Sequence, residues 1–449
     1  MKSAVFFSVG MLLILSGCSV TSQEDAFRAV NDSVKKDLVW IKTPEQAREV
    51  ETRVYALLAQ PLNEENAVRI ALINNRMLQQ TYEEIGIAHA ELVQSGLMSN
   101  PILGYSLGRG GGMTTKTLTV ELAFLDLLWI PLRRELGGIA YEEAKLRVGD
   151  EVLRTVRDTK KAFIEARIAQ EIAAIQDERL KSNEASAQLA IRQFAAGNLS
   201  KRDRLKIQEA YAHVRTEAIK AHQNAASARE ELNKMIGIYG SATRYTFGKE
   251  GWALTEPPAS SEVLERTAIE KRLDVAAAKK RLEYAAKEAG ITENTRMLDN
   301  LTLEYEREKS TGEAHKNTLG VKIPLPIFDM GQARVGMAQA RYNQRYHQLY
   351  ALAVNVRSDV RRSHAALRYA YDIAREYRET IVGLNQGILE QTGLFYNGML
   401  DGIYELLEDQ RRLSEAKIAS LEAMAEYQIA AADLAYTVGA ASEESNETK

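Results

Sequence analysis

Two stretches of the chain alternate between apolar and polar residues, a pattern that predicts β-strands with one apolar face. The first stretch covers residues 101–124 and contains the glycine run Gly108–Gly112. The second covers residues 301–323 and contains the polar run Ser310–Glu313. Each stretch predicts two strands joined by a loop. The glycine run favours a flexible hairpin loop over a phosphate-binding loop, because no Lys-Ser/Thr pair follows it. The alternating apolar residues are Leu103, Tyr105, Leu107, Leu118, Val120, Leu122 and Phe124 in the first stretch, and Leu301, Leu303, Tyr305, Leu319, Val321 and Ile323 in the second.

The distribution of proline predicts two long helical regions, because helix interiors exclude proline. The chain has 8 prolines, and none lies between Pro131 and Pro257 or after Pro326. In the first region Leu146, Leu153, Val156 and Phe163 lie at coiled-coil spacing. The fold class is therefore mainly α with a small β part.

Capping signals set the boundaries of these helices. The first long helix is predicted from about residue 138 to 196, with Gly197 as its C-terminal cap and Ser200–Asp203 as the capping box of a returning helix. The second is predicted from residue 331 to 397. Helices of this length span roughly 90–100 Å. A shorter helix is predicted to begin after Asn63 and to end at Asn100, and Trp129–Pro131 is predicted to close the first strand pair.

The second half of the chain repeats the first, in the order helix, two strands, long helix, tight turn, long helix. Residues 268–272 correspond to residues 71–75, and the turn at Gly398 corresponds to that at Gly197. The predicted divisions are a lipoprotein signal peptide (1–17), a lead segment (18–60), the first repeat (61–237), a linker (238–258), the second repeat (259–438) and a disordered tail (439–449).

The N-terminus has the pattern of an export signal, with Lys2, a short apolar run and small residues. Residues Leu15–Cys18 resemble the bacterial lipoprotein box, which implies cleavage before Cys18 and acylation of that residue. The alternative is an ordinary signal with an incidental cysteine. Cys18 is the only cysteine, so a disulfide within one chain is excluded.

Composition argues against several functional classes. The chain of 449 residues is 45% apolar and has a formal net charge of −3 and a pI near 6.2, so it lacks the basic surface expected of a nucleic-acid-binding protein. No arrangement of nucleophile, base and orienting group is visible, and the 6 histidines form no paired metal motif. We expect no enzymatic activity, no cofactor and no metal site.

Four strands in one chain cannot close a barrel, and open sheet edges are not tolerated against lipid. The strands are nevertheless close to the length that a tilted outer-membrane strand needs. Symmetric assembly resolves this conflict. Three chains would supply a 12-stranded transmembrane β-barrel, which the long helices would continue as an α-barrel.

The order of these features resembles the TolC family of outer-membrane efflux proteins. The resemblance is carried by the lipoprotein box, the two-fold repeat, residues 323–334 (IPLPIFDMGQAR), residues 232–237 (LNKMIG) and the two glycine tips. It implies a homotrimeric channel of a tripartite efflux or type I export system, located in the outer membrane and extending into the periplasm. It also implies docking to a periplasmic adaptor and an inner-membrane transporter. The alternative is a non-pore periplasmic coiled-coil lipoprotein, such as an adaptor subunit.

The resemblance places candidate site residues at the helical tips. Gly197, Ser200, Asp203, Gly398 and Asp401 would form the periplasmic tip that docks the adaptor. An acidic gate could include Asp203, Asp401, Tyr404 and Glu405, although Tyr404 stands where the second repeat would need an acid. The simpler interpretation is that Ser200 and Asp401 cap helices. Trp129 and Phe328 are predicted to lie at the membrane interface, and a buried position is the alternative for Trp129.

Overall fold

The structure is a computed structural model that describes residues 22–249, 251–297, 301–398, 400 and 402–439. The chain divides into two compact units. One comprises residues 1–33, 81–149 and 273–353, and the other comprises residues 34–80, 150–272 and 354–449. Cys18 and Asp401 lie outside the described residues, as does the tail beyond Gly439.

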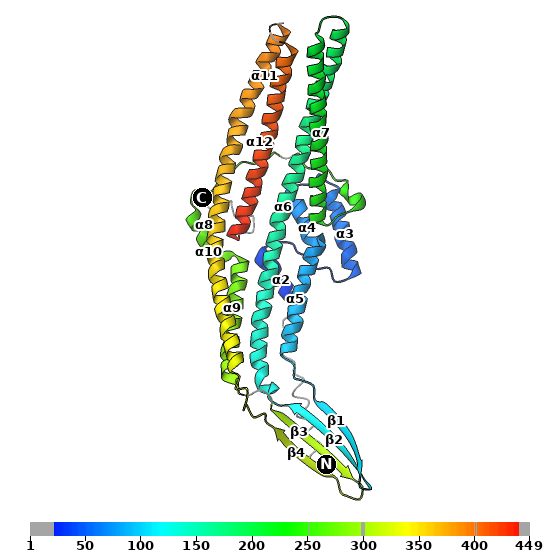
Figure 1. The fold of residues 1–449 in the computed structure, drawn as a ribbon, viewed down its shortest axis with the longest axis vertical. Coiled ribbons are helices and arrows are strands. Elements are labelled where there is room, and N and C mark those ends of the chain that lie inside the picture. The colour runs from blue at the N-terminus through cyan, green and yellow to red at the C-terminus, as the bar shows by residue number, and fades with distance from the viewer. Residues whose placement is uncertain (1–21, 250, 298–300, 399, 401, 440–449) are drawn as a thin grey trace. The chain divides into compact units, whose positions relative to one another are not determined.

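The first unit contains a four-stranded antiparallel sheet with the order β1-β2-β3-β4 (Figure 1). Its strands are β1 (Ile102–Gly110), β2 (Met113–Ala123), β3 (Thr302–Ser310) and β4 (Lys316–Lys322). Both predicted strand pairs are present. The β1–β2 connection differs from the predicted flexible loop, because the strands continue to Gly110 and Met113 and leave only Gly111 and Gly112 between them. Both glycines have positive φ, +59° and +80°, as the tightest hairpin turns require.

Helices α2 (Gln23–Val34), α5 (Arg76–Ser95) and α9 (Leu273–Thr295) accompany the sheet in this unit, with the sheet-proximal parts of α6 and α10. The strand-to-helix junctions repeat a contact. Arg133 donates a hydrogen bond to the carbonyl of Leu97, and Arg334 donates one to the carbonyl of Arg296. At the second junction Gly331 has φ +76°, and a Cβ there would lie 2.8 Å from the same Arg296 oxygen. Only glycine fits this position, which explains its place in the 323–334 sequence.

The first long helix, α6, runs from Asp126 to Ala195 and has 70 residues. The predicted start near residue 138 is therefore wrong, and Pro131 lies inside the helix rather than before it. Pro131 is in the second helical turn, so a single preceding turn has to accommodate its ring. Trp129 lies in the first turn of α6, and the strands end at Ala123.

The second unit holds the remaining helices, α3 (Pro44–Leu58), α4 (Glu64–Asn74), α7 (Lys201–Ile236), α8 (Ser261–Lys271), α11 (Val382–Asn397) and α12 (Ile403–Val438). Helix α10 (Gln332–Glu376) continues through a π-helical turn, Tyr377–Ile381, into α11, so the predicted long helix from residue 331 to 397 is confirmed. The core joins Leu62, Ile70, Phe163, Leu232 and Ile236.

Each repeat contains one helix break that the sequence pattern does not predict. Helices α4 and α5 are separated at Asn75, and α8 and α9 are separated at Arg272, with ψ values of 117° and 128°. The predicted single helix from residue 63 to 100 is therefore two. In the first repeat, the Asn75 amide donates to the carbonyl of Met235 and the Asn74 amide donates to that of Gly237.

In the second repeat, Arg272 donates to the carbonyl of Thr437. Gly237 and Gly439, which cap the returning helices, have φ values of +71° and +74°. The breaks thus fasten the ends of α7 and α12, at the positions where the two halves were predicted to correspond.

The linker between the repeats has little regular structure, as predicted, with one short 3-10 helix at Gly240–Thr243. It is nevertheless part of the core. Tyr245 and Phe247 are buried, and Phe247 forms a bridge with Leu62. Among the described residues, no helix combines the length and the apolar character needed to cross a membrane.

Candidate functional site

The sheet has one apolar and one polar face, and its register assigns every residue to one of them. Leu103, Val120, Tyr305 and Leu319 form one continuous row across the four strands. The intervening positions form the polar face. Side-chain hydrogen bonds agree with the assignment, because Tyr305 donates to Asn317 on the apolar face and Thr115 pairs with Ser310 on the polar face. The polar face includes Thr117, Thr119, Glu121, Thr302, Glu304, Glu306, Glu308, Lys316, Thr318 and Lys322.

The apolar face is the more exposed of the two. Along β3, Tyr305, Arg307 and Lys309 are exposed, whereas the polar-face residues between them are half-buried. Leu103 on β1 is 70% exposed and Leu319 on β4 is 77% exposed. A sheet in water would turn this face inward, so the arrangement is that of a sheet whose apolar face is covered by something outside the chain.

A three-strand ion cluster lies on the polar face. The ammonium of Lys322 is 2.7 Å from a carboxylate oxygen of Glu121 and 3.1 Å from one of Glu304. The remaining acids of this face, Glu306 and Glu308, follow along β3. Four glutamates and two lysines therefore share it, and its charge is negative.

The two predicted interface residues lie next to the sheet in the first unit. Phe328 is 96% exposed and Trp129 is half-buried. They have exposed apolar neighbours in both strand-to-helix segments, namely Leu127, Leu128, Leu325 and Ile327. Exposed apolar side chains therefore follow both β2 and β4 in the sequence.

The first helical tip has the predicted capping geometry. Gly197 has φ +80° and ends α6. The Ser200 hydroxyl accepts a hydrogen bond from the Asp203 backbone N–H at 3.0 Å and donates one to the Asp203 carboxylate at 2.6 Å. Ser200 is therefore the N-cap of α7, and the Asp203 carboxylate is held against it.

The second tip is built differently. Gly398 has φ −79°, and Gly402 is the N-cap of α12, without a side-chain hydrogen bond. The expectation that Asp401 caps this helix concerns a residue outside the described ranges. Tyr404 and Glu405 are exposed in the first turn of α12, and the Lys206 ammonium lies 5.4 Å from the Tyr404 ring centre.

A groove runs between the two helical hairpins in the second unit. Ile207 and Val214 of α7 and Leu407 of α12 give it apolar walls. Its charged residues include Arg179, which pairs with Glu217 at 2.6 Å, and Arg411, which lies between Glu408 and Glu415. The hydrogen bond from Arg411 holds the pKa of Glu408 below its ordinary value. The sequence analysis did not find this groove, because its walls come from residues about 200 positions apart.

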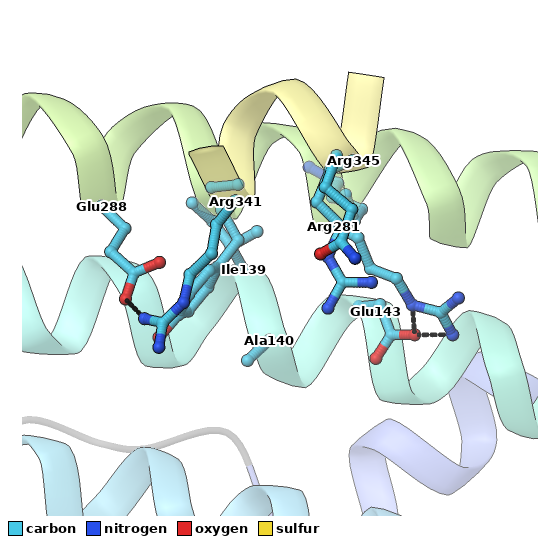
Figure 2. A pocket seen from close by; sticks show the side chains of 11 residues that line it. Ile139, Ala140, Glu143, Arg281, Glu288, Arg341 and Arg345 are labelled. Carbon is cyan, nitrogen blue, oxygen red and sulfur yellow. Dashed lines mark hydrogen bonds and ion pairs between the residues drawn. The ribbon is translucent and has the colours of Figure 1, made fainter. Parts of the chain in front are cut away.

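A second depression lies among α6, α9 and α10 in the first unit (Figure 2). Arg281 pairs with Glu143 at 2.6 Å, and Arg341 lies 3.5 Å from Glu288. Arg345 donates to Gln348. These ion pairs join three helices, so the depression is better understood as helix packing than as a ligand site. Within the described ranges, no three His, Cys, Asp or Glu side chains gather as metal ligands would.

Comparison with known proteins identifies the family. The family model described as "Outer membrane efflux protein" matches residues 128–238 and 264–440. The chain belongs to this family. Membership confirms the predicted outer-membrane location and the role of an efflux channel, over the alternative of a non-pore coiled-coil lipoprotein. The efflux protein thus uses the mainly helical, two-repeat fold that its sequence predicts.

Individual relatives are distant in sequence but similar over most of their length. The efflux protein is 26% identical over 376 residues to the cobalt-zinc-cadmium resistance protein CzcC of Cupriavidus metallidurans, covering 81% of this chain and 86% of the relative. It is similar in structure to the Campylobacter jejuni CmeC outer membrane channel, with a TM-score of 0.73 and 15% identity, covering 84% of this chain and 85% of the other. A membrane protein from Pseudomonas aeruginosa gives a TM-score of 0.72 and 19% identity, covering 84% and 92%.

Proposed function

We propose that three copies of the efflux protein form one passive conduit, with the polar faces of their sheets lining its membrane part. The sheet carries this proposal. Within the described residues β1 and β4 are each paired on one side only, and the exposed face of the sheet is the apolar one. Joining β1 of one copy to β4 of the next satisfies both edges, places the apolar faces against lipid, and encloses water between the polar faces.

The conduit can be tested with two neighbouring substitutions in β2. Val120→Lys places a charge on the apolar face, and Thr119→Lys places the same charge on the polar face. A lysine facing lipid near the membrane centre costs about 2–4 kcal/mol. We expect Val120→Lys to abolish trimers in native mass spectrometry and conductance in planar bilayers, and Thr119→Lys to retain both. A monomeric, non-conducting wild type would refute the conduit.

The groove between the hairpins is the proposed binding site of a periplasmic adaptor, which would connect the conduit to an energised inner-membrane transporter. It combines apolar walls with charged side chains, as partner-binding surfaces do. Leu407→Arg should abolish co-purification with the adaptor. Leu421, which packs against the core in the same helix, offers a control as Leu421→Met. Unchanged adaptor binding by Leu407→Arg would contradict the assignment of the groove as the adaptor-binding site.

The tips are the proposed entrance of the conduit, with Asp203 and Asp401 near the opening. The double variant Asp203→Asn with Asp401→Asn should reduce cation preference, since rings of acids select cations. Ser200 still caps α7 when Asp203 is asparagine, so the variant changes charge more than structure. Unchanged conductance and ion preference would exclude both acids from the entrance of the conduit.

We propose that the conduit prefers positively charged cargo. The name of CzcC refers to metal cations, and the polar face of this chain carries more acids than bases. Glu306→Gln with Glu308→Gln should shift the reversal potential in a salt gradient toward zero. Arg307→Gln, on the opposite face, should not.

Lipidation of Cys18 is a separate proposal, based on the lipoprotein box. Cys18→Ser should remove acyl labelling from the exported protein. Normal labelling of this variant would refute the assignment.

A further inference from the structure

The acids of the sheet all lie on one of its faces, whereas the charged residues of the other face are all cations. All four charged residues of the apolar face are cations, namely Arg109, Lys116, Arg307 and Lys309. No acid lies on the apolar face of the four described strands, because Glu121, Glu304, Glu306 and Glu308 all belong to the polar face. We call Arg109, Lys116, Arg307 and Lys309 the outward cation cluster.

The cluster occupies three successive rows at the hairpin end of the sheet. Lys116 is directly paired with Lys309, Arg307 is paired with Leu118, and Arg109 is paired with Thr114 next to the Gly111–Gly112 turn. The row Leu103, Val120, Tyr305 and Leu319 lies on the other side of Leu118, farther from the turns. The row Leu103, Val120, Tyr305 and Leu319 is thus wholly apolar, whereas the rows nearer the turns, about 7 Å apart, combine the four cations with Tyr105, Leu107 and Leu118.

The cluster has no internal counter-charge. All four side chains are exposed, and within the described ranges none forms an ion pair with a carboxylate. The paired lysines 116 and 309 lie directly opposite each other, an arrangement that destabilises a strand pair when both are charged. An external anion bound between the two strands would remove this repulsion.

The position of the cluster restricts what that anion can be. A charged side chain that faces lipid is tolerated only near the membrane surface, where headgroups begin. The guanidinium groups can bind phosphate with two parallel hydrogen bonds, and the lysines add point charge. Lys116 and Lys309, on neighbouring strands about 4.8 Å apart, are close enough to share one phosphate group.

We propose that the outward cation cluster binds the phosphate groups of an anionic, phosphorylated glycolipid in the leaflet that surrounds the hairpin ends. The proposal rests on the assignment of the apolar face to lipid in the proposed conduit. Each copy would hold this lipid against its own β1, β2 and β3. The bound lipid would neutralise the Lys116–Lys309 pair and fix the depth of the sheet in the membrane.

Binding can be measured on the full-length protein in detergent, with bisphosphorylated lipid A and its dephosphorylated form as probes. Lys116→Gln with Lys309→Gln should weaken binding of bisphosphorylated lipid A at least tenfold. The matched control, Lys316→Gln with Lys322→Gln, makes the same change of net charge on the polar face and should change binding less than twofold. Lys116→Arg with Lys309→Arg should keep wild-type binding, which separates charge from any effect on folding.

The probes also separate the possible sources of the phosphate. Excess inorganic phosphate should displace little of the lipid, because the acyl chains contribute contacts that the free ion lacks. Equal binding of dephosphorylated lipid A, or full displacement by inorganic phosphate, would overturn the proposal, as would wild-type binding by the outward glutamine variant. Conductance reports on the conduit independently. The outward glutamine variant should conduct like the wild type, whereas a wild type that does not conduct would refute the conduit whatever the lipid measurement shows.

Discussion

The two repeats share one plan but differ in how much of their long helix they bury. Helix α6 of the first repeat buries large side chains along its length, including Val148, Val152, Phe163 and Ile168. Helix α10 of the second repeat buries Val356, Val360 and Leu367 but leaves six large apolar side chains exposed along its length. These are Met337, Tyr346, Tyr350, Val354, Tyr369 and Ile373.

Part of the difference comes from the lead segment. Val50 and Val54 of α3 belong to the same core as Phe163, and Phe27 of α2 packs edge-on against the buried Tyr82 of α5. The lead helices thus cover first-repeat surfaces. The comparison teaches that two repeats can share one backbone plan and yet bury different amounts of apolar surface. The exposed apolar side chains of the second repeat are those that neighbouring copies would cover in the proposed conduit.

The largest effect on stability is expected from a substitution in the buried core around α6. Phe163 is 2% exposed in the core, so Phe163→Ala should lower the free energy of unfolding by about 3–5 kcal/mol. Tyr369 is 71% exposed on α10, and Tyr369→Ala should leave the stability of a single chain nearly unchanged while lowering the trimer fraction. Denaturant unfolding and native mass spectrometry measure the two quantities. Equal losses of chain stability in Phe163→Ala and Tyr369→Ala would show that the two long helices do not differ in how much they contribute to the core of a single chain.

The capping glycines test whether the two joints are equivalent. A Cβ on Gly237 would lie 2.9 Å from the Asn74 carbonyl oxygen, and one on Gly439 would lie 3.0 Å from the Arg272 nitrogen. Gly237→Ala and Gly439→Ala should each lower the free energy of unfolding by more than about 2 kcal/mol, since the left-handed backbone alone costs roughly 1–2 kcal/mol. Gly197→Ala, with open space around its Cβ, should show the backbone effect alone. Similar losses at all three glycines would show that the close approaches do not matter.

The tips should respond in opposite directions. Ser200→Ala removes the cap of α7 and should destabilise it by about 1 kcal/mol. Gly402→Ser adds a capping hydroxyl to α12, where the structure has none, and should stabilise it by a few tenths of a kcal/mol. Hydrogen exchange of amides in the first turn of each helix measures both. Faster exchange in both variants would show that the second tip cannot use a cap.

The smallest effect is expected at Glu408. Its pKa is lowered in the folded chain by the Arg411 hydrogen bond, so its contribution to stability is present above the unfolded pKa of about 4.3 and is lost as pH falls through the lower, folded value. The pair is partly exposed and solvent-screened. Glu408→Gln should therefore slightly lower the thermal unfolding temperature at pH 7, with the difference from the wild type vanishing in acid. A difference that grows as pH falls would contradict this sign.

The sequence predicted the strands, the returning helices and the first tip because local signals specify them. Alternation, proline gaps and the Ser200–Asp203 box each act within a few residues. The breaks at Asn75 and Arg272 escaped prediction because their cause is distant. Asn75 bonds to Met235, 160 positions along the chain, and its own neighbourhood has ordinary helical periodicity. The groove between the hairpins was missed because it is formed by the packing of residues that are distant in the sequence. The start of α6 was missed because the helix tolerates Pro131 in its second turn.

The hairpin loops of the sheet are short, which limits how much of the protein is accessible from outside the cell. Only two glycines join β1 to β2, and residues 311–315 join β3 to β4. In the proposed conduit, with these ends facing outward, each copy would display few side chains above the bilayer. Antibodies and phages that attach to surface loops would find little to hold on this protein.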